Sequence, residues 1–283
     1  MPTVTASLRR NVISMISKNQ AKLIRQLEQK KYRQRESLFV AEGPKVVGDL
    51  LRAGFITNSI FATATWIAAT VSQKVGNSSL PIIEVTNEEL RKVSFLQHPQ
   101  QVLALFKIPV SHFPSPTSPP PSSITPHPSP SKSAALSLAL DGIQDPGNLG
   151  TIIRIADWFD IDNIYCSPDT ADVWSPKVVQ ATMGSIAHVN IIYTSLTQLL
   201  SQADVPVYGT LLDGDDIYTQ TLSSGGIIVM GNEGNGISPE IRQLVTHRLL
   251  IPSFRQGDAA ESLNVAIATA ITCSEFRRRN NIY

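Results

Sequence analysis

Residues 136–159 read LSLALDGIQDPGNLGTIIRIADWF, and this stretch decides the fold class. The apolar run at 136–140 is typical of a buried strand, and Asp145-Pro146-Gly147 after it is typical of a turn. We expect Asn148 to be the N-cap of a helix over 149–159 whose apolar face points into the core. A buried strand that leads through a turn into an amphipathic helix is the start of a strand–helix–strand unit.

The same alternation continues along the chain. We expect strands at 136–140, 162–166, 188–193, 206–211, 226–230 and 247–251, and helices at 149–159, 175–183, 195–203, 239–246 and 262–279. Strands that alternate with helices predict an α/β fold with a parallel sheet covered on both faces. Ligands of such sheets bind outside the carboxyl ends of the strands, so we look for a site in the loops there.

A proline-rich segment separates this part from the rest of the chain. Residues 111–133 contain eight prolines and eight serines and no acidic residue, which is typical of an extended spacer. We therefore expect three parts: a domain at 1–109, a linker at 110–133 and a second domain at 134–283. A proline-rich recognition peptide is the alternative for the linker, although no other feature supports it.

The sequence pattern of residues 1–109 predicts a smaller α/β domain. We expect a basic helix at 17–31, further helices at 44–53, 65–74 and 87–92, and strands at 38–40, 59–61, 81–85 and 102–106. Residues 1–27 are basic and lack acidic residues, as in an organelle transit peptide. The helical pattern continues through them, so we interpret them as part of the domain.

The charges of the chain are distributed unevenly. Residues 1–109 carry 15 basic and 7 acidic side chains, whereas residues 134–283 carry 8 and 16, within a total net charge of +1. A basic part of this density favours contact with RNA or DNA, and an ordinary solvated basic helix is the alternative. The composition excludes a membrane protein, and two cysteines form neither a disulfide framework nor a zinc site. We expect a reducing compartment, namely the cytoplasm, and no bound metal.

A second loop follows the strand at 226–230 and reads GNEGNGISPE. Its glycines let the backbone approach a ligand closely, but their spacing matches neither a dinucleotide fingerprint nor a P-loop. Glu233 within it is either a solvated turn residue or an acid of a site. The third loop runs from Pro252 to the last helix, which Glu261-Ser262-Leu263-Asn264 opens. A serine at a helix start is ordinarily a cap, so hydrolase chemistry at Ser262 is not expected.

The three loops together carry a more specific pattern. Asn148-x-Gly150-x-x-x-Arg154, then Gly231-Asn232-Glu233-Gly234-x-Gly236, then Ile251-Pro252 and Glu261-Ser262-Leu263-Asn264, in this order, resemble the SpoU (TrmH) family of the SPOUT class. The resemblance spans 136–279. It implies a trefoil-knotted parallel α/β domain, bound S-adenosyl-L-methionine, a homodimer through this domain, and methylation of a ribose 2′-hydroxyl in RNA. The stretch between Pro252 and Glu261 is longer than the family form, and Gly257 is our match for the family glycine.

The first part carries a weaker resemblance. Residues 18–54, KNQAKLIRQLEQKKYRQRESLFVAEGPKVVGDLLRAG, resemble the L30e/L7Ae-like substrate-binding domain that precedes many SpoU enzymes and binds structured RNA. This resemblance favours ribosomal RNA over transfer RNA as the substrate. Alternatives that stay open are a tRNA methyltransferase, base methylation by the same fold, and an RNA-binding protein without turnover.

The resemblance also implies roles for individual residues. Arg154 is the principal catalytic residue, with Asn148 and Glu233 fixing the loops and Ser262 and Asn264 orienting the ribose or the arginine. A guanidinium is protonated at neutral pH, so we expect Arg154 to hold a phosphate and stabilise the developing alkoxide. The cofactor-binding residues that the resemblance implies, largely through main-chain groups, are Thr210, Leu211, Gly231, Gly236, Ile251 and Leu263.

Overall fold

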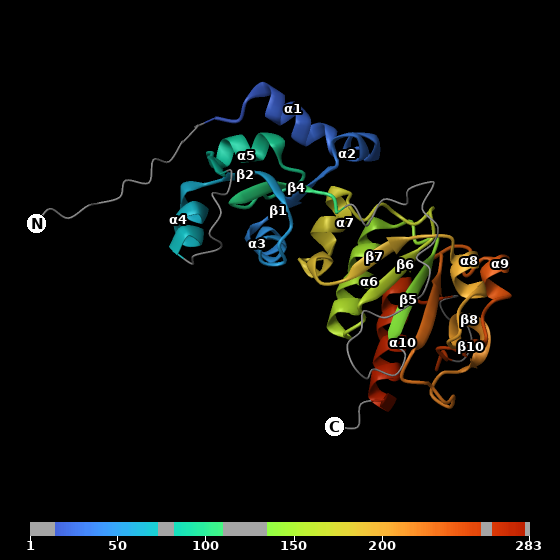
Figure 1. Cartoon of the computed structure of the whole chain (residues 1–283). Coiled ribbons are helices and arrows are strands. Elements are labelled where there is room, and N and C mark those ends of the chain that lie inside the picture. Colours follow the sequence, from blue (N-terminus) through green and yellow to red (C-terminus); the bar gives the residue numbers. More distant parts are fainter. Residues whose placement is uncertain (1–14, 73–81, 110–134, 256–261, 281–283) are drawn as a thin grey trace, which may run out of the picture. The chain divides into compact units, whose positions relative to one another are not determined.

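The computed structural model describes residues 15–72, 82–109, 135–255 and 262–280 (Figure 1). The chain divides into two compact units, Met1–Lys107 and Ile108–Tyr283. The expected linker at 110–133, Gly257 and Glu261 lie outside the described residues.

The first unit is a four-stranded sheet with helices on both faces. Its elements are α1 (Lys18–Gln26), α2 (Lys30–Glu36), β1 (Leu38–Glu42), α3 (Pro44–Arg52), β2 (Thr57–Ala62), α4 (Ala64–Ser72), β3 (Ile82–Glu84), α5 (Asn87–Val93) and β4 (Val102–Lys107). The strand order is β1-β4-β2-β3, with β4 antiparallel to both of its neighbours and β3 parallel to β2.

Alternation along β1 explains the two layers of this unit. Leu38 and Val40 belong to the same buried cluster as Ile24 of α1, whereas the ring of Phe39 stacks on that of Phe106 with centroids 5.7 Å apart. Successive side chains of a strand point to opposite faces, so an entirely buried strand needs cover on both. Figure 1 shows α1 and α5 on one side of this sheet and α3 on the other.

The single basic helix expected at 17–31 is wrong, because the chain breaks between α1 and α2. The guanidinium of Arg33 donates hydrogen bonds to the carbonyl oxygens of Leu27 (2.7 Å) and Glu28 (2.6 Å) at this break. A helix end leaves carbonyl groups without intrahelical partners, and a buried arginine satisfies them here. The pattern of basic residues contains no sign of this break.

The second unit is a six-stranded sheet whose strand pairs are all parallel, as the alternating pattern predicts. The strand order is β10-β8-β9-β5-β6-β7. The elements are β5 (Leu136–Asp141), α6 (Pro146–Trp158), β6 (Asn163–Cys166), α7 (Pro176–Ala181), the 3-10 helix η2 (Ser185–Ala187), β7 (Asn190–Tyr193), α8 (Leu196–Ser201), β8 (Val207–Asp216), β9 (Gly226–Gly231), α9 (Pro239–Arg242), β10 (His247–Leu250) and α10 (Val265–Asn280).

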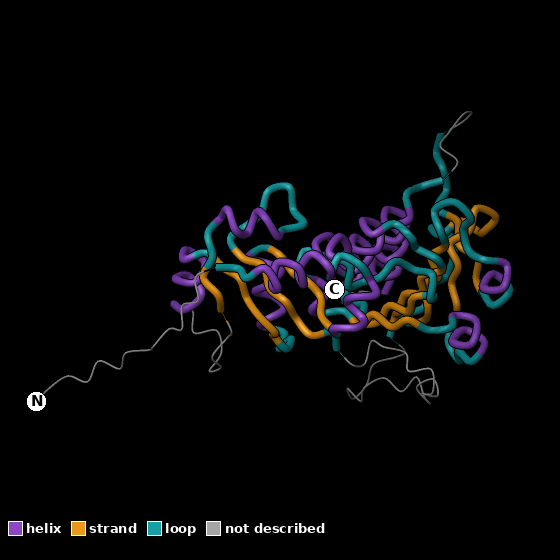
Figure 2. Tube along the Cα trace, turned by 90° about the horizontal axis from the view of Figure 1, so that it is seen from above, coloured by secondary structure: helices purple, strands orange, loops and turns teal. Residues whose placement is uncertain are grey.

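Helices cover both faces of this sheet. Leu196 and Leu200 of α8 and Ile241 of α9 pack in one buried cluster with strand residues of one face. Helix α6 packs against α7 and α10 on the opposite face. In Figure 2 helices can be followed beside the strands of each unit.

Two helices of this unit begin at other residues than the sequence suggests. Helix α6 begins at Pro146, and Asp145 is its N-cap, because its Oδ1 accepts a hydrogen bond from the backbone N–H of Asn148 (2.7 Å). Proline at the first position is preorganised for a helix start. Helix α10 begins at Val265, and Asn264, not Ser262, caps it. Asn148 and Ser262 as caps are therefore wrong, and both errors have consequences for the site.

Gly150 permits the close approach of two helices. A Cβ at this position would lie 2.4 Å from the Cβ of Ala181 and 3.1 Å from the carbonyl oxygen of Val178, both in α7. Gly150 lies inside α6, so no turn requires it. It is required by the packing of α6 on α7.

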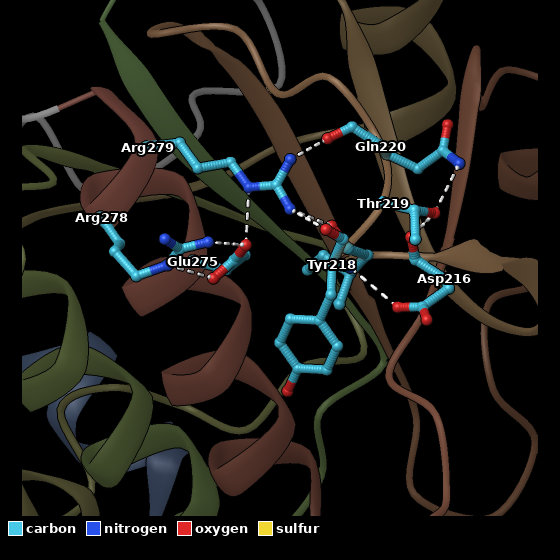
Figure 3. A network of polar contacts seen from close by, with 8 residues as sticks. Asp216, Tyr218, Thr219, Gln220, Glu275, Arg278 and Arg279 are labelled. Atoms are coloured by element: carbon cyan, nitrogen blue, oxygen red, sulfur yellow. Dashed lines mark hydrogen bonds and ion pairs between the residues drawn. The ribbon is translucent and has the colours of Figure 1, made fainter.

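The end of α10 is joined to the segment that follows β8 by a polar network (Figure 3). The carboxylate of Glu275 accepts hydrogen bonds from Arg278 (2.8 and 2.9 Å) and from Nε of Arg279 (2.6 Å). These hydrogen bonds, first with Arg278 and then with Arg279, lower the pKa of Glu275 to about 2. The guanidinium of Arg279 also donates to the carbonyl oxygens of Ile217, Tyr218 and Gln220.

Candidate active site

Two of the three loops identified in the sequence lie side by side because the strands that precede them, β5 and β9, are neighbours in the sheet. Strands β5 and β9 pair in parallel, and the last pair of this ladder is Asp141 with Gly231. From β5 the chain proceeds to β6 on one side, whereas β9 lies on the other side. This is a switch point of the sheet, where loops leave in opposite directions and open a crevice. The loops 142–145 and 232–238 both begin there.

Asn148 joins these two loops to the third. Its Nδ2 donates a hydrogen bond to Oε1 of Glu233 (2.7 Å), and its Oδ1 accepts one from Nδ2 of Asn264 (2.9 Å). The cap correction explains why this is possible. Because Asp145 caps α6, the side chain of Asn148 is free to reach across to the other loops. Three residues, from the first turn of α6, the turn after β9 and the start of α10, thus form one hydrogen-bonded chain, which we call the Asn–Glu–Asn chain.

The orientation of each amide in the Asn–Glu–Asn chain is fixed by its partners. Oδ1 of Asn264 accepts hydrogen bonds from the backbone N–H groups of Ala266 (3.0 Å) and Ile267 (3.3 Å) at the start of α10. Its Nδ2 therefore faces Asn148, which must accept there and can donate only toward Glu233. The backbone N–H groups at the start of α10 therefore determine that Asn148 presents its Nδ2 to the carboxylate of Glu233.

The glycine-containing turn that carries Glu233 is held by two residues that the sequence analysis missed as site residues. Oδ1 of Asn232 accepts from the N–H groups of Gly234 (2.9 Å) and Asn235 (3.1 Å), and its Nδ2 donates to the carbonyl oxygen of Gly142 (2.6 Å). Oδ2 of Asp141 accepts from the N–H of Ser238 (2.7 Å). Asp141 and Asn232 could have been identified in the sequence because both lie at the carboxyl ends of buried strands, where ligands of parallel sheets bind.

The glycines of this turn have a local reason as well. A Cβ on Gly231 would lie 2.3 Å from the backbone of Gly236 and Ile237, so the chain closes on itself here. Gly236 has a φ of +69°, which favours glycine, and its missing Cβ would meet no atom within 4 Å. Gly236 therefore borders open space, whereas Gly231 does not.

Arg154 and Ser262 are not part of the Asn–Glu–Asn chain. Arg154 is exposed, and it makes no hydrogen bond or ion pair with any residue that the structure describes. It lies six residues after Asn148 on α6, which places it about 240° further around the helix. Ser262 is exposed and has no hydrogen bond within the described part of the chain.

Most of the expected cofactor residues lie in or directly after three adjacent strands, β10, β8 and β9, whereas Leu263 lies just before α10. Leu211 is 9% exposed and belongs to the buried cluster beneath α8, so only its main chain is available to a ligand. Oγ1 of Thr210 donates to the carbonyl oxygen of Val229 (3.3 Å). Ile251, after β10, is half-buried, and Leu263 is 49% exposed.

A register shift interrupts the ladder along this part of β8. The β8–β10 ladder pairs Gly209 with Arg248 and then Asp215 with Leu249, so residues 210–214 have no ladder partner in β10. Main-chain groups of this bulge, open space at Gly236 and the half-exposed side chain of Leu263 suit a ligand with a flat apolar ring and polar edges. The residues present therefore fit an adenosine-containing cofactor.

Other chemistries find little support in the described residues. No group of three or more His, Cys, Asp or Glu side chains among them could hold a metal ion. Burial raises the pKa of both thiols, that of Cys273 to about 12, so neither is a ready nucleophile. Within the same residues, no helix has the length and apolar character of a membrane span.

Comparisons with known proteins match both units to family models. Residues 135–274 match the model of the SpoU rRNA Methylase family, and residues 18–104 match that of the MRM3-like substrate binding domain. The chain is 28% identical over 258 residues to the 23S rRNA (guanosine(2553)-2'-O)-methyltransferase RlmP of Bacillus subtilis (strain 168), covering 89% of this chain and 94% of the relative.

Two solved structures cover nearly the whole chain. One, described as an RNA methyltransferase of the TrmH family from Porphyromonas gingivalis, is 39% identical with a TM-score of 0.79 and covers 94% of this chain and 100% of its own. The other, an AdoMet-bound rRNA methyltransferase from Sinorhizobium meliloti, is 31% identical with a TM-score of 0.77 and covers 95% and 99%.

Proposed function

This chain belongs to the SpoU rRNA methylase family, and from that premise we propose that it methylates a ribose 2′-hydroxyl of ribosomal RNA with S-adenosyl-L-methionine. The observation that carries the proposal is the Asn–Glu–Asn chain, which joins the three loops at the switch point of the sheet. Ribosomal RNA is favoured over transfer RNA because RlmP of Bacillus subtilis and RlmB of Neisseria meningitidis are named for 23S rRNA.

The reaction needs alignment more than it needs an acid or a base. When bound, S-adenosyl-L-methionine would supply an electrophilic methyl carbon on a sulfonium centre; the ribose 2′-oxygen would attack that carbon in line, and the sulfur would leave as a neutral thioether. Two reactants held in the correct geometry react much faster than free ones. The Asn–Glu–Asn chain supports this alignment by joining the start of α6, the turn after β9 and the start of α10.

We assign separate roles to the side chains. Arg154, which has no partner among the described residues, is free to bind a phosphate of the substrate and stabilise the alkoxide that develops on the ribose. The proton passes to a phosphate oxygen or a water, because a guanidinium does not accept it. Glu233 and Asn148 are positioning residues, and Ser262 orients the ribose. Asn264 caps α10 and orients Asn148, so it acts through that residue.

We also propose which residues hold the cofactor. Main-chain groups of Thr210 and Leu211, the open side of Gly236, and the side chains of Ile251 and Leu263 border one region at the ends of β8, β9 and β10. Gly231 contributes by letting the turn close, which sets the position of Gly236. We further propose that the second unit contains the trefoil knot that the resemblance to the SpoU family implies.

Exposed apolar side chains support a homodimer. Trp158 of α6 is 84% exposed and Ile267 of α10 is 55% exposed, and these two helices pack against each other. Because Asn264 bonds to Asn148 and Arg277 bonds to Phe159, the two helices run in the same direction, and Trp158 and Ile267 lie toward opposite ends of the pair. Large apolar side chains exposed on packed helices are typical of a subunit interface. Arg154 lies one helical turn before Trp158, so the second copy would border the proposed catalytic arginine. Light scattering of Trp158→Asp should show monomers if this face is the interface.

The function is tested by methyl transfer to ribosomal RNA. Ribosomal RNA from cells that lack this protein should accept labelled methyl from S-adenosyl-L-methionine, and nuclease digestion should place the label on a 2′-oxygen. RNA from cells that contain the protein is the control, because its site is already methylated. Label on a base, or on neither RNA, would contradict the proposal. An rRNA substrate and two buried, unpaired thiols favour the cytoplasm as the place of action.

A further inference from the structure

The proposed reaction leaves a groove between α1 and α2 without a role. The groove has a volume of about 570 Å³. Its polar lining residues are Lys18, Lys22, Arg25, Gln26, Gln29 and Tyr32. None of the described residues that line it is acidic, so it presents three cations, two amides and a phenol to solvent.

The cations of this groove are available to a ligand. Lys18 and Lys22 are exposed and make no hydrogen bond or ion pair with any residue in the described ranges. Arg25 donates one hydrogen bond to the carbonyl oxygen of Lys92 (2.8 Å), which orients its guanidinium. The three lie at i, i+4 and i+7 of α1, on one face and over about 10 Å of helix axis. This length equals about three nucleotide steps of a helical strand.

The aromatic side of the groove is also in place. The ring of Tyr32 lines it, and Nζ of Lys31 and Cζ of Arg35 lie 5.0 and 4.8 Å from the ring centroid. The hydrogen bonds of Arg33 to the end of α1 hold α2 against it, so the groove exists before a ligand arrives. Aromatic rings beside cations are the pattern with which proteins bind single-stranded nucleic acids.

We propose that this groove binds one strand of RNA, with phosphates at Lys18, Lys22 and Arg25 and a nucleobase against Tyr32. The inference rests on the proposed function for the identity of the polyanion. The tyrosine ring in the lining favours a nucleic acid strand over an acidic protein segment, which offers carboxylates but no planar bases. The surface lies in the unit that carries the excess of basic residues, and it is separate from the residues of the methyl-transfer site.

The test measures RNA binding by the full chain without cofactor. The probe is a fluorescent oligouridylate of about 16 nucleotides, titrated between about 50 and 200 mM salt. Lys18→Ala combined with Lys22→Ala removes two phosphate contacts, so the slope of log K against log salt should fall by about 1.4, and affinity at 0.1 M salt should fall about 20-fold. Arg25 is left in place because it also holds α1 to Lys92.

Two controls distinguish binding at the groove from a general effect of net charge, and loss of the Tyr32 ring from loss of its hydroxyl. Lys107→Ala with Lys177→Ala removes the same charge from exposed positions elsewhere and should leave most of the affinity. Tyr32→Ala should weaken binding about 10-fold, whereas Tyr32→Phe, which keeps the ring, should not. Circular dichroism of each variant confirms that it is folded.

Three results would overturn the proposal. The first is an unchanged affinity and salt slope in the double lysine variant. The second is an equal loss in the Lys107 and Lys177 control, which would reduce the effect to net charge. The third is displacement of the probe by polyglutamate as effective as by polyuridylate, which would make an acidic protein the better partner. Binding is read without turnover, so failure of methyl transfer alone would not affect these outcomes.

Discussion

Replacing Gly150 with alanine should destabilise the second unit, although alanine is the better helix former. The methyl group would lie 2.4 Å from the Cβ of Ala181, more than 1 Å inside ordinary carbon–carbon contact. It would also lie 3.0 Å from the backbone carbon of the same residue and 3.1 Å from the carbonyl oxygen of Val178. Backbone atoms cannot move away as a flexible side chain can, so α6 and α7 must separate.

The magnitude follows from two opposing contributions. Glycine to alanine inside a helix is favourable by about 1 kcal/mol. Overpacking costs about 1–3 kcal/mol, and backbone neighbours place this site at the upper end. The net loss is therefore about 2 kcal/mol, which lowers the Tm of a unit of this size by about 4–8 °C.

Tryptophan fluorescence can follow this unit alone. The chain has three tryptophans, and Trp66 is the one in the first unit, so Trp66→Phe leaves Trp158 and Trp174 as reporters of the second. In this background we expect Gly150→Ala to lower the Tm, and Ala181→Gly combined with it to restore part of the loss. The double variant removes the closest of the clashing atoms, so its loss should be smaller than the sum of the two single losses.

A rise in Tm for Gly150→Ala would refute the reasoning, since helix propensity would then outweigh packing. A double variant that is no better than the sum of the single variants would refute the contact with Ala181 in particular. Because Asn148 lies two residues before Gly150, separation of α6 from α7 should also raise KM or lower kcat for methyl transfer.

Further predictions concern the site and the last helix. Arg154→Ala should leave cofactor affinity by calorimetry unchanged and lower kcat by about 100-fold, as loss of a transition-state donor does; equal loss of cofactor binding would contradict its role. Asn148→Ala leaves Glu233 without its donor and should lower kcat by up to about 100-fold through misalignment, with single-turnover kinetics as the assay. The pKa of Glu275 is lowered to about 2 from 4.5, so its contribution to stability is complete above pH 4.5 and is lost as the pH falls toward 2. Urea unfolding of Glu275→Gln should lack that part of the pH dependence; an unchanged pH profile would contradict it. Arg279→Ala should cost about 2 kcal/mol in urea unfolding because it removes charge-assisted hydrogen bonds, and a loss under about 0.5 kcal/mol would show that the network is solvated.

The sequence predicted the sheet well because its signals are periodic and local. The apolar runs that become β5 and β9 are buried along nearly their whole length, as central parallel strands must be. Helix boundaries were less predictable. The patterns around Asn148 and Ser262 are those of caps, but Asp145 and Asn264 form the hydrogen bonds. Several polar residues near a helix start can each cap it, and only the tertiary partners of the others decide which one does.

The residues of the candidate site were likewise predicted only in part. The order of the motifs indicated that Asn148, Glu233 and Asn264 act together, and the structure joins them. Asp141 and Asn232 were missed, because their partners are backbone groups of loops about 90 residues away, and local spacing contains no information about such a partner. Sequence patterns identify residues that share a motif more readily than residues that hold two motifs together.

The contact between Arg279 and the segment after β8 has a consequence for synthesis of the chain. Gln220 and Arg279 are 59 residues apart, so a ribosome that adds about 5–20 residues per second needs about 3–12 s to supply the second partner. During that interval the carbonyl groups of Ile217, Tyr218 and Gln220 lack the guanidinium that satisfies them in the finished structure. The nascent second unit therefore emerges with this segment unsecured, and the segment is secured only after α10 has left the exit tunnel.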